Sequence, residues 1–171
     1  MKFIPARKDT KIRIIYSALL IGAIICFSPI ASGIIHTVMQ SLGIVVLTSS
    51  LAIFIKYEST TFSYILIEKN GHFDFYIDKH VGKRGAYVCY FPVSDAVKIV
   101  KLTDTAKDEL RTEYENIYFY NYGKNVFCGE KHIIVFKNES KYDAVIFEPD
   151  EKFVSLIKED MEKHLKEADA E

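Results

Sequence analysis

Apolar residues dominate one uninterrupted stretch near the start of the chain. Residues 14–55 form a run of 42 positions without a single Lys, Arg, Asp or Glu. One helical crossing of a bilayer's hydrocarbon core needs about 20 apolar residues, so the run is long enough for two crossings. Pro29 and Ser32 interrupt it near the middle, which predicts one helix over 14–31 and a second over 35–55. The pattern therefore predicts a transmembrane helical hairpin.

Basic residues flank this apolar run. Five Lys or Arg side chains and a single acid, Asp9, precede it, and Lys56 follows it. Basic residues favour the cytoplasmic side of a membrane, so we expect both termini in the cytoplasm and the turn around 32–36 outside. Two alternatives stay open, namely a signal peptide cleaved near residue 33 and a re-entrant hairpin.

Small residues recur along the first predicted helix. Ala18, Gly22 and Cys26 are each four positions apart, and a stripe of this kind lets two helices approach closely. The stripe predicts either packing within the hairpin or homodimerisation through the transmembrane helices.

Beyond the hairpin the pattern changes to the alternation of apolar and polar residues that is typical of half-buried strands. The first two predicted strands, 62–68 and 72–78, are joined at Asn70-Gly71, a pair that favours a tight hairpin turn. Five more strands are predicted over 86–91, 96–102, 116–122, 131–137 and 142–147. The charged stretch 103–115 is predicted to be a surface loop or a short exposed helix.

The last element is an amphipathic helix. Pro149 suits its first turn, where Asp150 and Glu151 complement the helix dipole. Apolar residues then recur at spacings of three and four, at Phe153, Leu156, Ile157, Met161 and Leu165. A mainly-β domain of about seven antiparallel strands, capped by a C-terminal α-helix, has the element order of a pleckstrin-homology-like (PH-like) barrel.

The predicted organisation has three parts, and their charges differ. They are a basic cytoplasmic N-terminus over 1–13, the transmembrane hairpin over 14–56 and the PH-like cytoplasmic domain over 57–171. From residue 57 onward the chain has 16 basic and 22 acidic residues, a net charge of −6, whereas the whole chain has −1. The N-terminus therefore suits anionic lipid headgroups, and the domain as a whole repels them.

Short motifs along the chain resemble those of a known family. The two predicted membrane helices, Asn70-Gly71, Ile77-Asp78-Lys79, Gly82-Lys83-Arg84 and the run from Ile146 to Glu151 are together similar to an uncharacterised family of small bacterial membrane proteins. Its members are similar to membrane-anchored PH-like proteins of Gram-positive bacteria. The resemblance implies a fold and a location in the cell membrane, and it implies no catalytic residue.

A basic cluster stands out in the acidic domain. It consists of Lys79, His80, Lys83 and Arg84. Only about five residues join the hairpin to the first strand, so the turn after the second strand returns close to the membrane. Each basic side chain near an anionic surface contributes on the order of 1 kcal/mol. The cluster is predicted either to orient the domain against the inner leaflet or to be a plain solvated turn, with specific ligand binding as a third alternative.

Three tyrosines share one face of a predicted strand. Tyr118, Tyr120 and Tyr122 alternate with Ile117 and Phe119, and either face can belong to the core. Tyrosine is favoured at protein interfaces. The three side chains are therefore a candidate partner surface if they point outward, and core or rim residues if they point inward.

Motifs of catalysis and metal binding are missing from the sequence. It contains no GxSxG, no Gly-rich phosphate loop and no HExxH. His72 and Asp74 share one side of a predicted strand, but a solvated strand face explains them. Cys26, Cys89 and Cys128 are odd in number, have no CxxC spacing and suit a reducing compartment. We expect neither an enzyme nor a bound cofactor or metal.

Two functions follow from these expectations. The first is a non-enzymatic, membrane-anchored PH-like interaction or scaffold module at the cytoplasmic face of a bacterial membrane. The second is an accessory subunit of a membrane transporter or envelope complex, docked through its transmembrane helices. Both imply the lipid bilayer and an unknown protein as partners, and neither implies nucleic acid.

Overall fold

The computed structural model describes residues 1–6, 9–28, 33–82, 84–127 and 129–168. Four residues used above lie outside this set, namely Pro29, Ser32, Lys83 and Cys128.

The chain forms two compact units, and each is described by itself. The helical unit comprises Lys8–Thr60 and Asn125–Cys128. The β unit comprises Met1–Arg7, Thr61–Lys124 and Gly129–Glu171.

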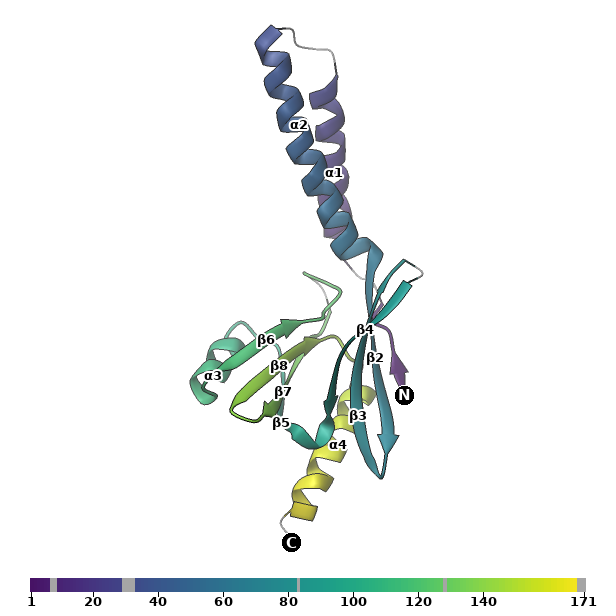
Figure 1. The fold of residues 1–171 in the computed structure, drawn as a ribbon, viewed down its shortest axis with the longest axis vertical. Coiled ribbons are helices and arrows are strands. Elements are labelled where there is room, and N and C mark those ends of the chain that lie inside the picture. The colour runs from purple at the N-terminus through teal and green to yellow at the C-terminus, as the bar shows by residue number, and fades with distance from the viewer. Residues whose placement is uncertain (7–8, 29–32, 83, 128, 169–171) are drawn as a thin grey trace. The chain divides into compact units, whose positions relative to one another are not determined.

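The helical unit is a two-helix hairpin (Figure 1). Helix α1 spans Thr10–Phe27 and α2 spans Gly33–Ile53, and a short π-helix, η1, continues α2 over Phe54–Ser59. Two helices were predicted and are confirmed, but their bounds extend past the apolar run. Lys and Arg have good helix propensity, so the flanking charged residues continue the helices.

The β unit contains two four-stranded sheets. The first has the order β1-β2-β3-β4 and the second the order β5-β7-β8-β6. The strands of the first sheet are β1 (Lys2–Phe3), β2 (Thr60–Lys69), β3 (His72–Val81) and β4 (Arg84–Pro92). Those of the second are β5 (Ala96–Lys101), β6 (Ile117–Asn121), β7 (His132–Asn138) and β8 (Lys141–Phe147).

The predicted seven-stranded antiparallel barrel differs from the structure in three respects. An additional strand, β1, pairs antiparallel with β2 and places Phe3 opposite Tyr64. Strand β6 pairs parallel with β8, with Ile117 opposite Tyr142, and the two sheets do not close into one barrel. A two-residue strand is too short to show a period, and alternation predicts the faces of a strand but not the direction of its neighbour.

The turn between β2 and β3 confirms the sequence prediction. Asn70 and Gly71 have φ angles of 56° and 85°. Positive φ at both central residues is typical of a type I′ turn, whose twist matches that of the flanking strands.

One hydrophobic core lies between the first sheet, the second sheet and α4 (Glu151–Ala168). Its fully buried aromatic side chains are Tyr64, Phe75, Phe136, Phe147 and Phe153. Burial of this much apolar surface is the main stabilising contribution to the fold.

A second, smaller cluster covers the other face of the second sheet. Helix α3 (Ala106–Glu113) buries Ala106 and Leu110 against Ile133 and Ile146. Strands β7 and β8 are therefore covered on both faces, which explains their continuous apolar runs. The stretch 103–115, predicted as a loop or an exposed helix, holds a helix with one buried face.

The C-terminal helix begins at Glu151, two residues after Pro149, which was predicted to lie in its first turn. The Oδ1 atom of Asp150 accepts a hydrogen bond of 2.8 Å from the backbone N–H of Phe153. Asp150 is thus the N-cap, and Pro149 precedes the helix instead of occupying its first turn. Phe153 and Ile157 are fully buried, as predicted, whereas Leu165 is 63% exposed.

Candidate functional surfaces and buried polar clusters

The helical unit exposes an unusually apolar surface. In each of the two helical segments, α1 and Gly33–Ser59, only 11% of the most apolar stretch is buried, and both segments have the length and composition of a membrane span. Exposed side chains include Ile21, Ile24, Ile34 and Val45. Soluble monomers rarely expose contiguous apolar patches of more than a few hundred Å². The surface is therefore a candidate for contact with lipid.

The two helices approach each other closely at Gly43 of α2. A Cβ atom at this position would lie 3.0 Å from Cβ of Cys26 and 3.1 Å from the Phe27 ring. A second contact is polar, because Ser50 donates a hydrogen bond of 2.9 Å to the carbonyl oxygen of Tyr16. Small residues on α2, Gly43 and Ser50, therefore allow α1 and α2 to pack closely.

The predicted small-residue stripe has only one member at this contact. Cys26 touches α2, whereas Ala18 is exposed and Gly22 faces open space. The face that α1 buries instead contains Ile12 and Ala23, at 6% and 1% exposure.

Polar groups gather where α1 begins and η1 ends. Arg13 forms an ion pair of 3.3 Å with Glu58, and the Tyr16 hydroxyl lies 3.5 Å from the other carboxylate oxygen. The Tyr16 ring also packs edge-on against Phe54, with 5.6 Å between ring centroids. Charged and aromatic side chains of this kind are enriched at membrane–water interfaces.

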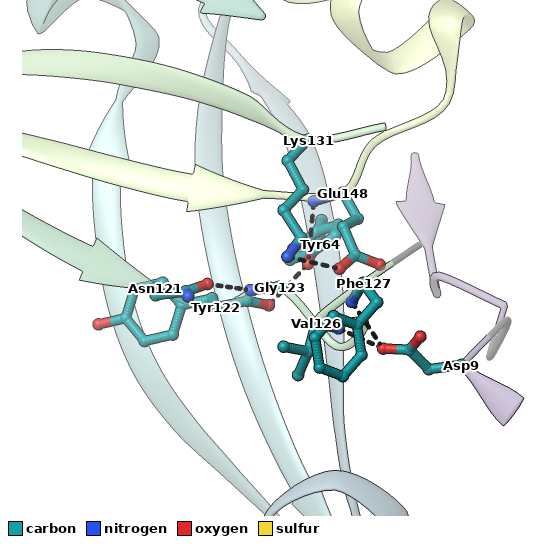
Figure 2. Close-up of polar contacts among 9 residues, drawn as sticks. All are labelled: Asp9, Tyr64, Asn121, Tyr122, Gly123, Val126, Phe127, Lys131 and Glu148. Atoms are coloured by element: carbon teal, nitrogen blue, oxygen red, sulfur yellow. Dashed lines mark hydrogen bonds and ion pairs between the residues drawn. The ribbon is translucent and has the colours of Figure 1, made fainter. Parts of the chain in front are cut away.

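A short loop is joined to the start of α1. The Asp9 carboxylate accepts hydrogen bonds from the backbone N–H groups of both Val126 and Phe127 (Figure 2). The side chains of Val126 and Phe127 are 39% and 57% exposed, and Lys11 lies 5.9 Å above the Phe127 ring. No local sequence pattern predicts this loop, because nothing local connects Asp9 with residues more than a hundred positions away.

The basic cluster is divided by the structure. His80 turns inward, where its Nε2 lies 3.2 Å from the hydroxyl of the buried Ser63 and its ring covers Gly85. Lys79 and Arg84 are exposed, and neither forms an ion pair with the residues described. Lys83 lies outside these residues. Two of the four predicted residues, Lys79 and Arg84, are thus exposed.

The tyrosine face is also divided. Tyr118 and Tyr120 are 50% and 42% exposed, whereas Ile117 and Phe119 pack against the smaller core cluster. Tyr122 lies past the end of β6 and packs edge-on against Phe62, with 5.6 Å between ring centroids. Burial raises the pKa of Tyr122. The exposed pair is therefore the part of this face available to a partner.

A buried polar cluster links β2 to the segments after β6 and β8 (Figure 2). The fully buried Tyr64 hydroxyl donates a hydrogen bond of 2.8 Å to the Tyr122 carbonyl and accepts one of 3.2 Å from the N–H of Glu148. Burial raises the pKa of Tyr64, so its hydroxyl stays protonated and can donate. Glu148 itself is 5% exposed, and Lys131 lies 4.0 Å from its carboxylate.

Gly123 occupies a confined position in this cluster. A Cβ atom there would lie 3.0 Å from Oε1 of Glu148, 3.2 Å from Oδ1 of Asn121 and 3.3 Å from Cε of Lys131. Its N–H donates a hydrogen bond of 2.9 Å to Asn121. The hydrogen bonds of Tyr64 and of the Gly123 N–H each satisfy a backbone group, so they hold the start of the loop after β6 in place.

Cysteine and histidine side chains are candidate metal ligands and nucleophiles by residue type. Cys26 and Cys89 are half-buried and form no disulfide. Burial raises the pKa of the Cys89 thiol, and this disfavours the reactive thiolate. Among the residues described, His72, His164 and Glu167 each place one possible metal-ligand atom within 4.8 Å of the other two. The sequence pattern relates His72 only to Asp74 on its own strand, and it gives no sign of His164, which lies on α4.

The two mainly antiparallel sheets and the helix packed on their core place the β unit in the mainly-β class that includes PH-like domains. The chain belongs to the bacterial PH-like domain family (DUF6106), whose model matches residues 2–167. The match confirms the PH-like, bacterial part of the resemblance found in the sequence. The family description assigns no activity. Comparisons with curated proteins and with solved structures give no match.

Proposed function

We propose that this protein is a non-enzymatic, membrane-anchored PH-like interaction module at the cytoplasmic face of a bacterial cell membrane. The observation that carries the proposal is the exposed apolar surface of α1 and α2. These helices are part of a chain that belongs to the bacterial PH-like family. Transfer of such a surface from water into lipid is favourable by about 25 cal/mol per Å².

The ends of the helical unit support this location. Arg13 and Glu58 lie at the end opposite the turn between the helices, as does the Tyr16–Phe54 pair. The exposed Val126 and Phe127 belong to the same compact unit and are bonded to Asp9, which directly precedes α1. Apolar tips beside basic residues suit the headgroup region, where Lys11 reaches anionic lipid and Phe127 reaches the acyl boundary.

Membrane insertion is tested by fractionation. After expression in bacteria, the full chain should stay in the membrane pellet after extraction with alkaline carbonate and should be released by detergent. Release by carbonate alone would show peripheral binding and would overturn the proposal of a spanning hairpin.

Topology is tested by cysteine labelling in a chain whose native cysteines are replaced by Ala. Ile34→Cys, at a site 84% exposed before the change, should react with an impermeant maleimide in intact cells. Ser140→Cys, in the turn between β7 and β8, should react only after lysis. The reverse result would invert the topology and remove the cytoplasmic assignment.

A second candidate function is an accessory subunit of a membrane transporter or envelope complex. It is favoured by Ala18 and Gly22, small residues that α2 leaves uncovered and that permit close approach of another helix. That helix belongs either to a different membrane protein or to a second copy of this chain. Copurification in mild detergent separates the cases: an integral-membrane partner at constant stoichiometry favours the accessory subunit, and soluble partners alone favour the interaction module.

A further inference from the structure

We propose that His72, His164 and Glu167 form a binding site for a divalent transition-metal ion, for which Zn²⁺ is the suitable probe. One ligand atom from each residue lies within 4.8 Å of the other two. His72 is the first residue of β3, and the other two lie near the end of α4. A bound ion would therefore tie the end of the helix to the β2–β3 turn, within the β unit.

The two ring nitrogens of His72 have different surroundings. Nε2 lies 3.2 Å from Oε2 of Glu167, and Nδ1 lies 3.4 Å from Oδ1 of Asp160. The Asp160 side chain is only 3% exposed, and its second oxygen accepts a hydrogen bond of 2.9 Å from the N–H of Phe73. Asp160 is thus fixed in place beside Nδ1.

Metal-binding histidines commonly place a carboxylate beside the ring nitrogen that is not a ligand. In His72, Nδ1 lies near Asp160 but forms no hydrogen bond with it, so the ring must turn slightly to form that bond. A carboxylate next to one ring nitrogen holds the proton there and leaves the other nitrogen unprotonated for the metal. In His72 the nitrogen left for the metal is Nε2, which already faces Glu167. Asp160 is accordingly a positioning residue and not a ligand.

The second imidazole comes from the helix. His164 and Glu167 are three positions apart on α4 and therefore share a face. The rings of His72 and His164 are 5.7 Å apart between centroids and nearly perpendicular, at 87°. Zinc–ligand distances of about 2.0–2.1 Å with tetrahedral angles place ligand atoms about 3.3 Å apart. The His72–Glu167 pair meets this spacing. The ligand atom of His164 lies within 4.8 Å of the other two, and its side chain would have to rotate to bring this atom closer.

The donor set suits zinc. Two imidazoles and one carboxylate are ligands that Zn²⁺ accepts, and three protein ligands leave a fourth position for water or for a partner's group. The nearby Lys163 opposes a cation, but its ammonium group is held by the Gly71 carbonyl at 2.9 Å. Its repulsion lowers the affinity without occupying the site.

The test is calorimetric titration of ZnCl₂ into the full chain in detergent, without a polyhistidine tag or chelator. Wild type should bind one Zn²⁺ tightly, and His72→Gln, His164→Gln and Glu167→Gln should each weaken binding at least tenfold. Asp160→Asn, which keeps an oxygen for Phe73, should weaken it about tenfold. The matched controls, His132→Gln and Glu162→Gln, remove the same side-chain types elsewhere and should bind as wild type does.

Thermal unfolding gives a second measurement, because a ligand that binds only the folded state raises the unfolding temperature. Zn²⁺ should raise the midpoint of wild type and of the two controls but not that of His164→Gln. The proposal is overturned if wild type binds no Zn²⁺, or if His164→Gln binds it as tightly as wild type does, which would place the ion elsewhere on the chain.

Discussion

The backbone N–H of Phe127 donates a hydrogen bond of 2.9 Å to the carboxylate of Asp9, a residue 118 positions earlier in the chain. The same carboxylate oxygen accepts the N–H of Val126. Asp9 is 4% exposed and precedes the first residue of α1, yet its side chain caps no helical N–H. The carboxylate instead accepts hydrogen bonds from the loop residues Val126 and Phe127.

Replacing Asp9 should therefore release this loop. A hydrogen bond to a charged group contributes about 1.5–3 kcal/mol, so Asp9→Ala should lower the free energy of unfolding by about 2 kcal/mol. Asp9→Asn keeps an oxygen acceptor and should cost less. Chemical unfolding of the full chain in detergent measures both, with Asp104→Asn, at an exposed site, as the control. Equal stability of Asp9→Ala and wild type would contradict the role of the carboxylate.

Tyr64→Phe should destabilise the β unit, because it removes the hydroxyl group and keeps the aromatic ring. The hydroxyl serves the Tyr122 carbonyl and the Glu148 N–H, and its loss leaves both backbone groups without this partner. An unsatisfied buried polar group costs about 1–3 kcal/mol. The unfolding midpoint should fall accordingly, whereas Tyr118→Phe, at a position 50% exposed, should leave it unchanged. The interpretation fails if the two variants are equally stable.

Gly123→Ala should destabilise the same region through crowding. The added methyl group would meet Glu148, Asn121 and Lys131 at 3.0–3.3 Å, and overpacking typically costs about 1–3 kcal/mol. Gly22→Ala is the matched control, because nothing lies within 4 Å of its added Cβ and Ala favours a helix. Thermal unfolding should give a lower midpoint for Gly123→Ala than for Gly22→Ala. A midpoint for Gly123→Ala at or above that of wild type would show that the neighbouring side chains move aside for the methyl group at no cost in stability.

The exposed residues of the basic cluster, Lys79 and Arg84, should bring the segment between them into contact with anionic lipid. An environment-sensitive fluorophore at Val81→Cys, introduced with the native cysteines replaced by Ala, lies between Lys79 and Arg84 in sequence. Its emission should shift to the blue in anionic vesicles relative to neutral ones. Added salt should reverse the shift, since charge attraction is screened over about 10 Å at 0.1 M.

Changing Lys79 and Arg84 to Ala should abolish this shift, and changing Lys69 and Lys152 to Ala should preserve it. A probe that gives the same spectrum in both kinds of vesicle at low salt would show that the turn is merely solvated.

His132 should make stability depend on pH. Burial lowers its pKa from the ordinary value of 6.5, against the opposing effect of Glu130, and Lys101 and Lys158 lower it further. As pH falls through 6.5, the unfolded chain binds a proton before the folded chain does, so stability decreases. His132→Gln should flatten the dependence between about pH 5 and 7. An NMR titration of His132 that gives an ordinary or raised pKa would refute this reading.

Local patterns of the chain predicted the elements that depend on local physics. The uncharged run over 14–55 predicted two helices, because a helix satisfies its own backbone and needs only apolar length to suit lipid. Asn70-Gly71 predicted a tight turn because few residues adopt two successive positive φ angles. The stripe containing Phe153 and Ile157 predicted the face of α4 that is buried.

Tertiary structure decided everything that depends on which distant segments meet. The pairing of Phe3 with Tyr64, the parallel pairing of β6 with β8, and the inward turn of His80 toward Ser63 leave no trace in periodicity. The same holds for the Asp9–Phe127 bond and for the approach of His72 to His164. A period of two or of 3.6 specifies which face of an element is apolar, whereas the partner of that face is chosen by packing across the whole unit.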